Sequence, residues 1–227
     1  MGSLLPGSGS IASARLEAVD RWATFDCYGT LIDWNGGIRR ELARVFGEER
    51  ADELLARYHE LEPELEADGS RSYREVLTEA MRRLGAPSGE EDTLARSLPD
   101  WQPFPEVPQA LRESRERGWR LAILSNTDRD YIEASMDRIG VPFDEVIVAS
   151  EVGSYKPALG HWRAFEEGVG RPPDVHVAAS LFHDIAPANE LRLPSIWINR
   201  LGEPPGPRPT RELPDLDRLA DTLAELA

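Results

Sequence analysis

Five residues have side chains that together can act on a small anion, and each follows an apolar run of the chain. They are Asp26, Ser125, Asn126, Lys156 and Asp184. A carboxylate can act as a nucleophile, and a hydroxyl and an amide ahead of a helix can hold an anion. Lys156 is the only lysine among 26 cationic residues, the others being arginine. Its compact ammonium fits beside a small anionic centre better than a guanidinium fork does.

A lysine close to Asp26 would keep that carboxylate charged. Two opposite charges about 4 Å apart attract by roughly 4 kcal/mol at an effective dielectric of about 20, before desolvation is counted. Each residue also has a simpler interpretation: Asp26 as a turn residue, Ser125 and Asn126 as a helix cap, Asp184 as an N-cap, and Lys156 as a surface lysine. Because all of them follow expected strands, we favour one shared site.

The elements that must position these residues alternate between short apolar runs and helical patterns. This alternation is typical of parallel strands joined by crossover helices, and it predicts an α/β fold with a Rossmann-like, doubly wound parallel sheet. The expected strands are 22–25, 120–124, 145–149, 175–179 and 195–198. Ligands of such sheets bind beyond the carboxyl ends of the strands, so we expect the five residues to converge there.

The first interval breaks this alternation, because roughly 70 residues of helical pattern separate the first two strands. An inserted helical cap subdomain at 35–100 explains the gap, with a core made of 20–34 and 101–227. We expect cap helices at 38–46, 51–65 and 73–84, a loop at 203–209 and a last helix at 216–226. The segment 1–19 is rich in Gly and Ser and is interpreted as a flexible leader.

Composition narrows the possible partners. The chain has 227 residues, a net charge of -15 and 41% hydrophobic residues, which suits a globular protein with a real core. Its acidity argues against binding nucleic acid or an anionic membrane surface through a general field. With one cysteine, Cys27, an intramolecular disulfide and a cysteine metal cluster are excluded. We expect a cytoplasmic location, since no signal peptide or membrane span is apparent.

The residues around these positions form four motifs that resemble those of the haloacid dehalogenase superfamily. The motifs are Phe25-Asp26-Cys27-Tyr28-Gly29-Thr30-Leu31, Leu124-Ser125-Asn126, Lys156-Pro157 and Asp184, and the resemblance covers 21–200. It implies that Asp26 attacks the substrate covalently and that water then hydrolyses the enzyme ester. Lys156 would orient charge, and Asp184 would serve the hydrolytic half. The inserted helices would close over the site.

The same resemblance implies the residues that contact the substrate. They are Tyr28, Thr30, Arg57, Ser125, Asn126 and Ser180. Arg57 is assigned because the L-2-haloacid dehalogenases have a cap arginine about thirty residues after the nucleophile. It lies 57 − 26 = 31 residues after Asp26. A guanidinium suits a weakly hydrated halide.

Two positions favour the dehalogenase branch over the phosphatase branch. Phosphatases of this superfamily carry a second aspartate two residues after the nucleophile, where this chain has Tyr28. That aspartate protonates the leaving alkoxide, whereas halide needs no proton to leave. In the phosphatases, the fourth motif supplies two aspartates to the metal site, and here Ser180 replaces the first of them. We therefore expect no cofactor. If Mg²⁺ were used, its ligands would be Asp26, the Tyr28 carbonyl and Asp184.

Three positions depart from the dehalogenase pattern. Ala179 and Leu181 replace a serine and an asparagine before Asp184, and Trp162 replaces a tyrosine after the lysine. The missing asparagine helps to place the hydrolytic water, and His183 is a candidate replacement base. The acidic stretch 60–68 is interpreted as a solvated face of the cap.

The sequence therefore predicts a hydrolase that removes halide from a small 2-haloalkanoic acid without a metal. A magnesium-dependent phosphatase acting on a small phosphate ester is the first alternative. An idle small-ligand binding protein that has lost turnover is the second. The expected partner is a small anionic substrate, and the resemblance makes a homodimer possible.

Overall fold

A six-stranded parallel sheet forms the centre of the protein. The computed structural model describes residues 20–67 and 69–226, so the segment interpreted as a leader lies outside the described residues. The strand order is β3-β2-β1-β4-β5-β6, and every neighbouring pair is parallel. The strands are β1 (Arg21–Phe25), β2 (Trp119–Ser125), β3 (Glu145–Val148), β4 (Val175–Ala178), β5 (Ser195–Ile198) and β6 (Arg211–Leu213).

Strand β1 lies in the middle of the sheet because its side chains suit burial on both faces. Four of its five residues are buried, and β2 and β4 flank it. The chain builds β2 and β3 on one side of β1 and then returns to build β4, β5 and β6 on the other. The order therefore reverses at β1, where α/β sheets bind their ligands.

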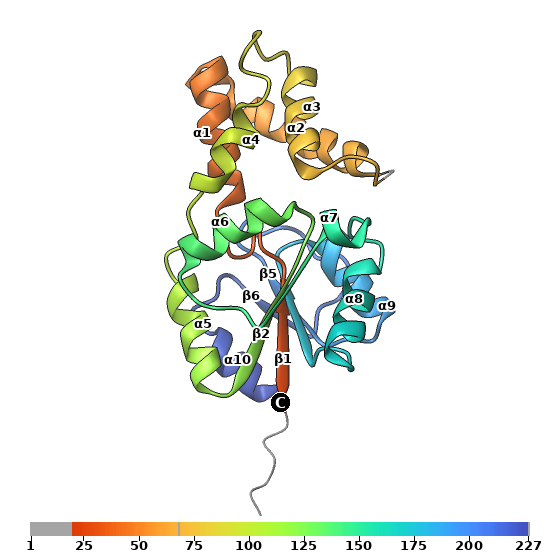
Figure 1. The fold of residues 1–227 in the computed structure, drawn as a ribbon. Helices are drawn as coiled ribbons and strands as arrows, with labels where there is room; N and C mark the ends of the chain where they lie inside the picture. Colours follow the sequence, from red (N-terminus) through yellow and green to blue (C-terminus); the bar gives the residue numbers. More distant parts are fainter. Residues whose placement is uncertain (1–19, 68, 227) are drawn as a thin grey trace, which may run out of the picture.

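Helices cover both faces of the sheet, as the doubly wound prediction requires. In Figure 1, α5 (Val107–Glu116) and α10 (Leu219–Glu225) lie on one side, and α8 (Gly160–Val169) and α9 (Ala186–Glu190) on the other. The remaining helical elements of the core are α6 (Arg129–Ile139), α7 (Ala149–Val152) and the π-helical turn η3 (Leu181–Ile185). The predicted fold class is confirmed.

A group of helices between β1 and β2 lies over one end of the sheet (Figure 1). It contains α1 (Trp34–Phe46), η1 (Glu48–Arg50), α2 (Ala51–Glu66), α3 (Tyr73–Arg83), α4 (Thr93–Ser97) and η2 (Leu98–Asp100). We call this group the cap. The helices occupy the stretch where the cap was predicted, and the exact domain boundaries stay a prediction.

The chain enters and leaves the cap through two segments that pair with each other. Asp33 N donates to Gln102 O at 2.9 Å, and Phe104 N donates to Leu31 O at 3.0 Å. A Cβ added at Gly37 would lie 2.4 Å from the Trp101 ring, so only glycine permits this close approach of α1 to the exit segment.

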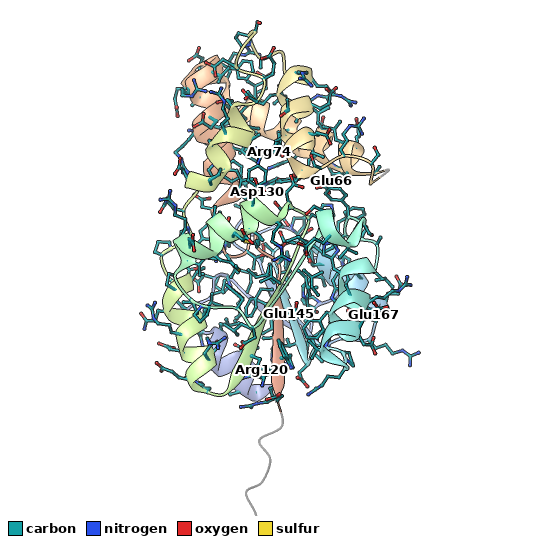
Figure 2. The ribbon with its side chains drawn as sticks, in the orientation of Figure 1. Glu66, Arg74, Arg120, Asp130, Glu145 and Glu167 are labelled. Atoms are coloured by element: carbon teal, nitrogen blue, oxygen red, sulfur yellow. The ribbon has the colours of Figure 1, made fainter. Side chains whose placement is uncertain are left out.

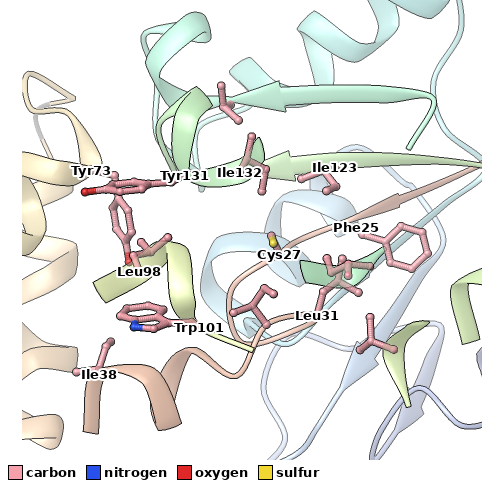
Figure 3. Close-up of a cluster of buried hydrophobic side chains, with 14 of the residues drawn as sticks. Phe25, Cys27, Leu31, Ile38, Tyr73, Leu98, Trp101, Ile123, Tyr131 and Ile132 are labelled. Carbon is pink, nitrogen blue, oxygen red and sulfur yellow. The ribbon is translucent and has the colours of Figure 1, made fainter. Parts of the chain in front are cut away.

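Buried side chains continue from the sheet into the cap, as Figure 3 shows. Phe25 and Ile123 belong to the sheet, Leu31 lies beside them, and Trp101 and Tyr73 belong to the same cluster at the cap. The cap thus shares a continuous hydrophobic core with the sheet.

One strand was missed by the sequence reading. Strand β6 pairs with β5 at the edge of the sheet, although the sequence suggested a loop running on to the last helix. Its three residues are Arg, Glu and Leu, too few and too polar to give a strand pattern.

Among the described residues, no helix is both long enough and apolar enough to cross a membrane.

Candidate active site

Asp26 stands at the carboxyl end of the central strand β1. Its backbone N donates to Val177 O on β4 at 3.0 Å, which extends the sheet pairing to the functional residue. The chain then turns sharply, with Leu31 N and Ile32 N both donating to Cys27 O. Gly29 has φ 89°, a left-handed conformation that side chains disfavour. The turn leaves the Asp26 side chain 11% exposed at the sheet edge.

Lys156 joins the two carboxylates that the sequence predicted to meet. Its Nζ lies 2.9 Å from Asp26 Oδ1 and 2.6 Å from Asp184 Oδ1, and it also donates to Leu124 O at 2.9 Å. All three donors of the ammonium are therefore used. Burial would lower the pKa of Lys156, but the charges of Asp184 and Asp26 raise it, so the lysine stays charged. The structure brings Asp26, Lys156 and Asp184 together.

Asp184 is held through Oδ1, which contacts both Lys156 and His176. His176 Nε2 lies 2.9 Å from Asp184 Oδ1, and Thr24 Oγ1 lies 2.9 Å from His176 Nδ1. Burial alone would raise the pKa of Asp184, but the Lys156 charge and the His176 contact hold it well below its usual range. His176 was not assigned to the site from sequence, because a histidine inside a strand has no spacing that reveals its neighbours.

Thr30 does not line the cavity, which corrects its assignment as a substrate contact. Its Oγ1 donates to Asp26 Oδ2 at 2.7 Å and accepts from Ala179 N at 2.9 Å, and the residue is fully buried. Thr30 therefore fixes the second oxygen of Asp26. The spacing of four residues from Asp26 placed it near the carboxylate but could not show which way the hydroxyl points.

A cavity of about 470 Å³ opens between the sheet edge and the cap. The predicted residues that line it are Asp26, Tyr28, Ser125, Asn126, Lys156, Ser180 and Asp184. Ser125 Oγ and Asp184 Oδ2 are buried atoms with no hydrogen-bond partner among the described residues. Asn126 Nδ2 donates to Lys156 O at 3.0 Å and to Glu66 Oε2 at 3.2 Å. Ser125 and Asp184 thus each bring a polar oxygen without a partner among the described residues to the cavity wall.

Arg57 does not reach the cavity, and its assignment as a halide contact is wrong for this structure. Its side chain is 58% exposed and pairs with Glu60 on the same helix. The face of α2 that meets the cavity carries Glu62 and Glu66, and residues four apart share a helix face. Arg57 is five residues before Glu62, so it lies on another face. The number of residues between Asp26 and Arg57 does not determine which face of α2 carries Arg57.

Glu62 and Glu66 line the cavity, although the sequence did not predict them as site residues. They are only 8% and 6% exposed, so the solvated-face interpretation is wrong for these two. It holds for Glu60 and Glu64, which are exposed. The three- and four-residue spacing of Tyr58, Leu61 and Leu65 was the signal that could have placed Glu62 and Glu66 on the inner face.

Burial shifts the two cap carboxyls toward their protonated forms. It raises the pKa of Glu62 to about 7, against the hydrogen bonds that Tyr73 and Tyr58 donate to the carboxylate. The pKa of Glu66 is raised well above its usual range by burial and by the charge of Glu62. Figure 2 shows Glu66 at the side of the cap that faces the core.

The positions that depart from the dehalogenase pattern have defined contacts. Ala179 supplies backbone groups, donating its N to Thr30 and accepting at O from Trp197 Nε1 at 2.9 Å. Trp162 is buried against His176, with ring centroids 5.3 Å apart, and does not line the cavity. His183 lines the cavity, with Nδ1 3.2 Å from Ser180 Oγ, and burial lowers its pKa.

The oxygen atoms of Asp26 and Asp184 fit a magnesium ion poorly. Lys156 donates to Oδ1 of both residues, and Thr30 donates to Asp26 Oδ2, so among these oxygen atoms only Asp184 Oδ2 has no partner within 20–67 and 69–226. Magnesium binds through carboxylates plus substrate phosphates in near-octahedral geometry. No group of three or more His, Cys, Asp or Glu side chains among the described residues is arranged to hold a metal ion. The Lys156 ammonium supplies positive charge between the two carboxylates.

Comparisons with known proteins agree with this arrangement. Residues 21–178 match the family model for haloacid dehalogenase-like hydrolases. An (S)-2-haloacid dehalogenase of Pseudomonas sp. (strain YL) is 30% identical, covering 78% of this chain and 82% of that protein. The (S)-2-haloacid dehalogenase 4A of Burkholderia cepacia is 26% identical, covering 91% and 93%. The crystal structure of the L-2-haloacid dehalogenase RSc1362 superposes with a TM-score of 0.80 at 26% identity, covering 90% and 99%.

The parallel sheet, the strand-end aspartates and the buried lysine define a hydrolase. The protein belongs to the haloacid dehalogenase-like hydrolases.

Proposed function

We propose that the protein hydrolyses the carbon–halogen bond of small 2-haloalkanoic acids through a covalent ester on Asp26, without a metal. The contact of Lys156 with Asp26 and Asp184 at the cavity wall carries this proposal. The similarity to (S)-2-haloacid dehalogenases supports it. So does Tyr28, which stands where a phosphatase of this superfamily would have its general acid.

In the first step, a carboxylate oxygen of Asp26 attacks C2 of the substrate from the side opposite the halogen. A carbon–oxygen bond forms, the carbon–halogen bond breaks, and the electron pair leaves with the halide. Lys156 keeps Asp26 charged, and Thr30 fixes its second oxygen. The Ser125 hydroxyl has no hydrogen-bond partner among the described residues, and we assign it to hold the substrate carboxylate.

In the second step, water attacks the ester carbonyl of Asp26. The ester bond breaks, the 2-hydroxy acid leaves with one proton of the water, and the oxygen of the water stays in the regenerated carboxylate. Asp184 lines the cavity and its Oδ2 has no hydrogen-bond partner in the described part of the chain, so it is the group we assign to hold this water. His183 lines the same cavity and can accept the proton, since its lowered pKa keeps the ring neutral.

The first test is halide release from (S)- and (R)-2-chloropropionate and from chloroacetate, measured in EDTA. We expect release from one enantiomer and complete loss in Asp26→Asn. Asp137→Asn, an exposed carboxylate change on α6, is the matched control and should keep wild-type activity. Absence of halide in every case would contradict the proposal.

The same samples separate the two alternatives. Magnesium-dependent release of phosphate from small phosphate esters would favour the phosphatase. Thermal stabilisation by 2-chloropropionate without any product would favour the idle binding protein.

The second test is intact-protein mass spectrometry after mixing with substrate. Asp184→Asn should accumulate a covalent adduct on Asp26, because the first step does not need the held water. Wild type should show no lasting adduct. If His183→Ala accumulates the adduct and Asp184→Asn does not, the assignment of water to Asp184 is wrong.

A further inference from the structure

The cavity lining contains more acidic than basic side chains. The acidic side chains that line it are those of Asp26, Asp33, Glu62, Glu66, Asp184 and Glu203, and the lysine and arginine side chains are those of Lys156 and Arg200. Both cations already have carboxylate partners, because Lys156 contacts Asp26 and Asp184, and Arg200 Nη2 lies 2.7 Å from Glu106 Oε1. The cavity therefore has an excess of acidic groups.

Glu62 and Glu66 each keep one oxygen available to a ligand. Glu62 Oε1 accepts from Tyr73 Oη at 2.8 Å and from Tyr58 Oη at 3.1 Å. Glu66 Oε2 accepts from Asn126 Nδ2 at 3.2 Å. Within 20–67 and 69–226, no hydrogen bond reaches Glu62 Oε2 or Glu66 Oε1. The two residues are one helical turn apart in α2, so these acceptors lie on one face.

Aromatic rings also line the cavity beside these carboxyls. Tyr28 stacks on Tyr73 with ring centroids 6.2 Å apart, and Trp34 stacks on His59 at 5.1 Å. Trp34 Nε1 donates to Tyr73 Oη at 3.0 Å, which ties the two stacks together. All four rings line the cavity. Aromatic faces attract cations, most strongly where water is excluded, so the rings and the carboxylates favour the same kind of ligand.

The core side of the cavity carries polar side chains. Ser125 Oγ and Asp184 Oδ2 are buried polar atoms without a partner among the described residues, and both residues line the cavity. Ser125 is 1% exposed and Asp184 is 1% exposed. Buried polar atoms of this kind are costly unless a bound molecule or water satisfies them.

We propose that Glu62 and Glu66 bind an ammonium group of the substrate, so that the protein acts on a 2-halo acid that carries a cationic amino group. The inference rests on the proposed function for the reacting end of that substrate. A plain haloalkanoate brings only negative charge to a cavity that is already acidic. A zwitterionic haloacid places its carboxylate near Ser125 and its ammonium against the cap carboxylates.

Binding of unreactive compounds tests this recognition without any turnover. Isothermal titration compares 4-aminobutanoate with pentanoate, which replaces the ammonium by a methyl group of similar size. At a pH of about 8, above the pKa of Glu62, we expect the amino compound to bind about tenfold more tightly or better. Glu62→Gln and Glu66→Gln should each reduce this preference.

Glu64→Gln is the matched control, because Glu64 lies on the exposed side of the same helix and pairs with Arg83 at 3.6 Å. It should leave the preference unchanged. Equal affinities, no binding of either compound, or a preference that persists in both folded Gln variants would overturn the inference. If one variant does not fold, the other decides.

Halide release separates this inference from the proposed function. We expect 4-amino-2-chlorobutanoate to have a higher kcat/KM than 2-chloropentanoate, with both activities lost in Asp26→Asn and with blanks correcting for spontaneous cyclisation. Halide release from 2-chloropentanoate with no preference for the amino compound would support the proposed dehalogenase activity and contradict the ammonium site. Glu-dependent binding of 4-aminobutanoate without halide release would do the reverse.

Discussion

The Thr30 hydroxyl fixes the position of Asp26 without touching the cavity. It donates to Asp26 Oδ2 at 2.7 Å and accepts from Ala179 N at 2.9 Å, so its orientation is set on both sides. Together with the contact of Lys156 at Oδ1, this hydrogen bond holds both oxygens of Asp26. Thr30 is thus a positioning residue.

We expect Thr30→Val to lower kcat by about 10²-fold with little change in KM, because a small displacement of the attacking oxygen disrupts the reactive geometry. Thr30→Ser should restore most of the rate, since it keeps the hydroxyl. Steady-state halide release measures both parameters. An equal loss in Thr30→Ser would show that the methyl group, not the hydroxyl, is what matters.

Lys156 compensates two buried carboxylates at once. We expect Lys156→Met to lower the free energy of unfolding by about 3–5 kcal/mol, the usual cost of leaving a buried charge without its partner. Urea denaturation followed by circular dichroism measures this change. Arg163→Met removes the same formal charge from an exposed site on α8 and should change stability by less than about 0.5 kcal/mol. Similar losses in the two variants would contradict a special role of the buried ammonium.

The strand-end residues could be predicted from sequence, whereas the cap residues could not. Asp26, Lys156 and Asp184 follow buried strands, and parallel strands bring their carboxyl ends to one edge whatever the details. Cap residues depend on which face of α2 meets the cavity. Arg57 was assigned from its distance along the chain, but it lies on an exposed face of α2. Glu62 and Glu66 were interpreted as part of a solvated acidic stretch, but both are buried.

At the scale of elements, the cap is held to the core through the start of α3. Tyr73 N and Arg74 N each donate to a carboxylate oxygen of Asp128 at 3.0 Å, although Asp128 belongs to the loop after β2. Ser72 and Glu75 complete a capping box at the same helix end. Figure 2 shows Arg74 and Asp130 facing each other across the same boundary, where they form an exposed ion pair at 2.5 Å.

We expect Asp128→Ala to destabilise the protein by about 1–2 kcal/mol, because two helix N–H groups lose their acceptor and the helix dipole loses a compensating charge. Hydrogen exchange should show faster exchange of the first amides of α3 than elsewhere in the cap. Asp130→Asn should cost less than about 1 kcal/mol, as exposed ion pairs do. Unchanged exchange at the start of α3 in Asp128→Ala would mean that Asp128 does not hold the cap.

The length and regularity of an element decided how well it could be predicted. The five predicted strands are mostly apolar and the helices α1, α2 and α3 have repeated apolar spacing, and the structure contains them with shifts of a few residues. Strand β6 has three residues and forms because β5 offers an open edge, which is a tertiary cause. The pairing of Leu31 and Asp33 with the exit from the cap has the same origin and left no local signal.

At the scale of the whole molecule, acidity is a property of the surface and of the cavity alike. The net charge is -15, and the cavity lining repeats the excess of acidic groups. A small anion must therefore approach against the general field, unless it carries a compensating cation. A homodimer stays a prediction.

The cap carboxyls also make the stability of the whole protein depend on pH. Burial raises the pKa of Glu62 to about 7 in the folded state, against an ordinary value of 4.5. The groups that face it are Tyr58, Tyr73, Glu66 and Asp26. Below a pH of about 4.5, Glu62 holds its proton in both the folded and the unfolded protein, so its contribution to the stability of the fold is fully present. This contribution is lost as the pH rises through about 7.

We therefore expect the melting temperature of wild type to fall relative to that of Glu62→Gln as the pH rises from about 4.5 to about 8, because only wild type must ionise this buried carboxyl. A shift of this size corresponds to a loss of about 3 kcal/mol at most. Differential scanning calorimetry at several pH values measures the difference between the two proteins. Glu64→Gln, on the exposed side of α2, should follow the wild-type curve throughout. Parallel curves for wild type and Glu62→Gln would show that folding does not raise the pKa of Glu62. Glu62 would then be charged at every pH between about 5 and 8.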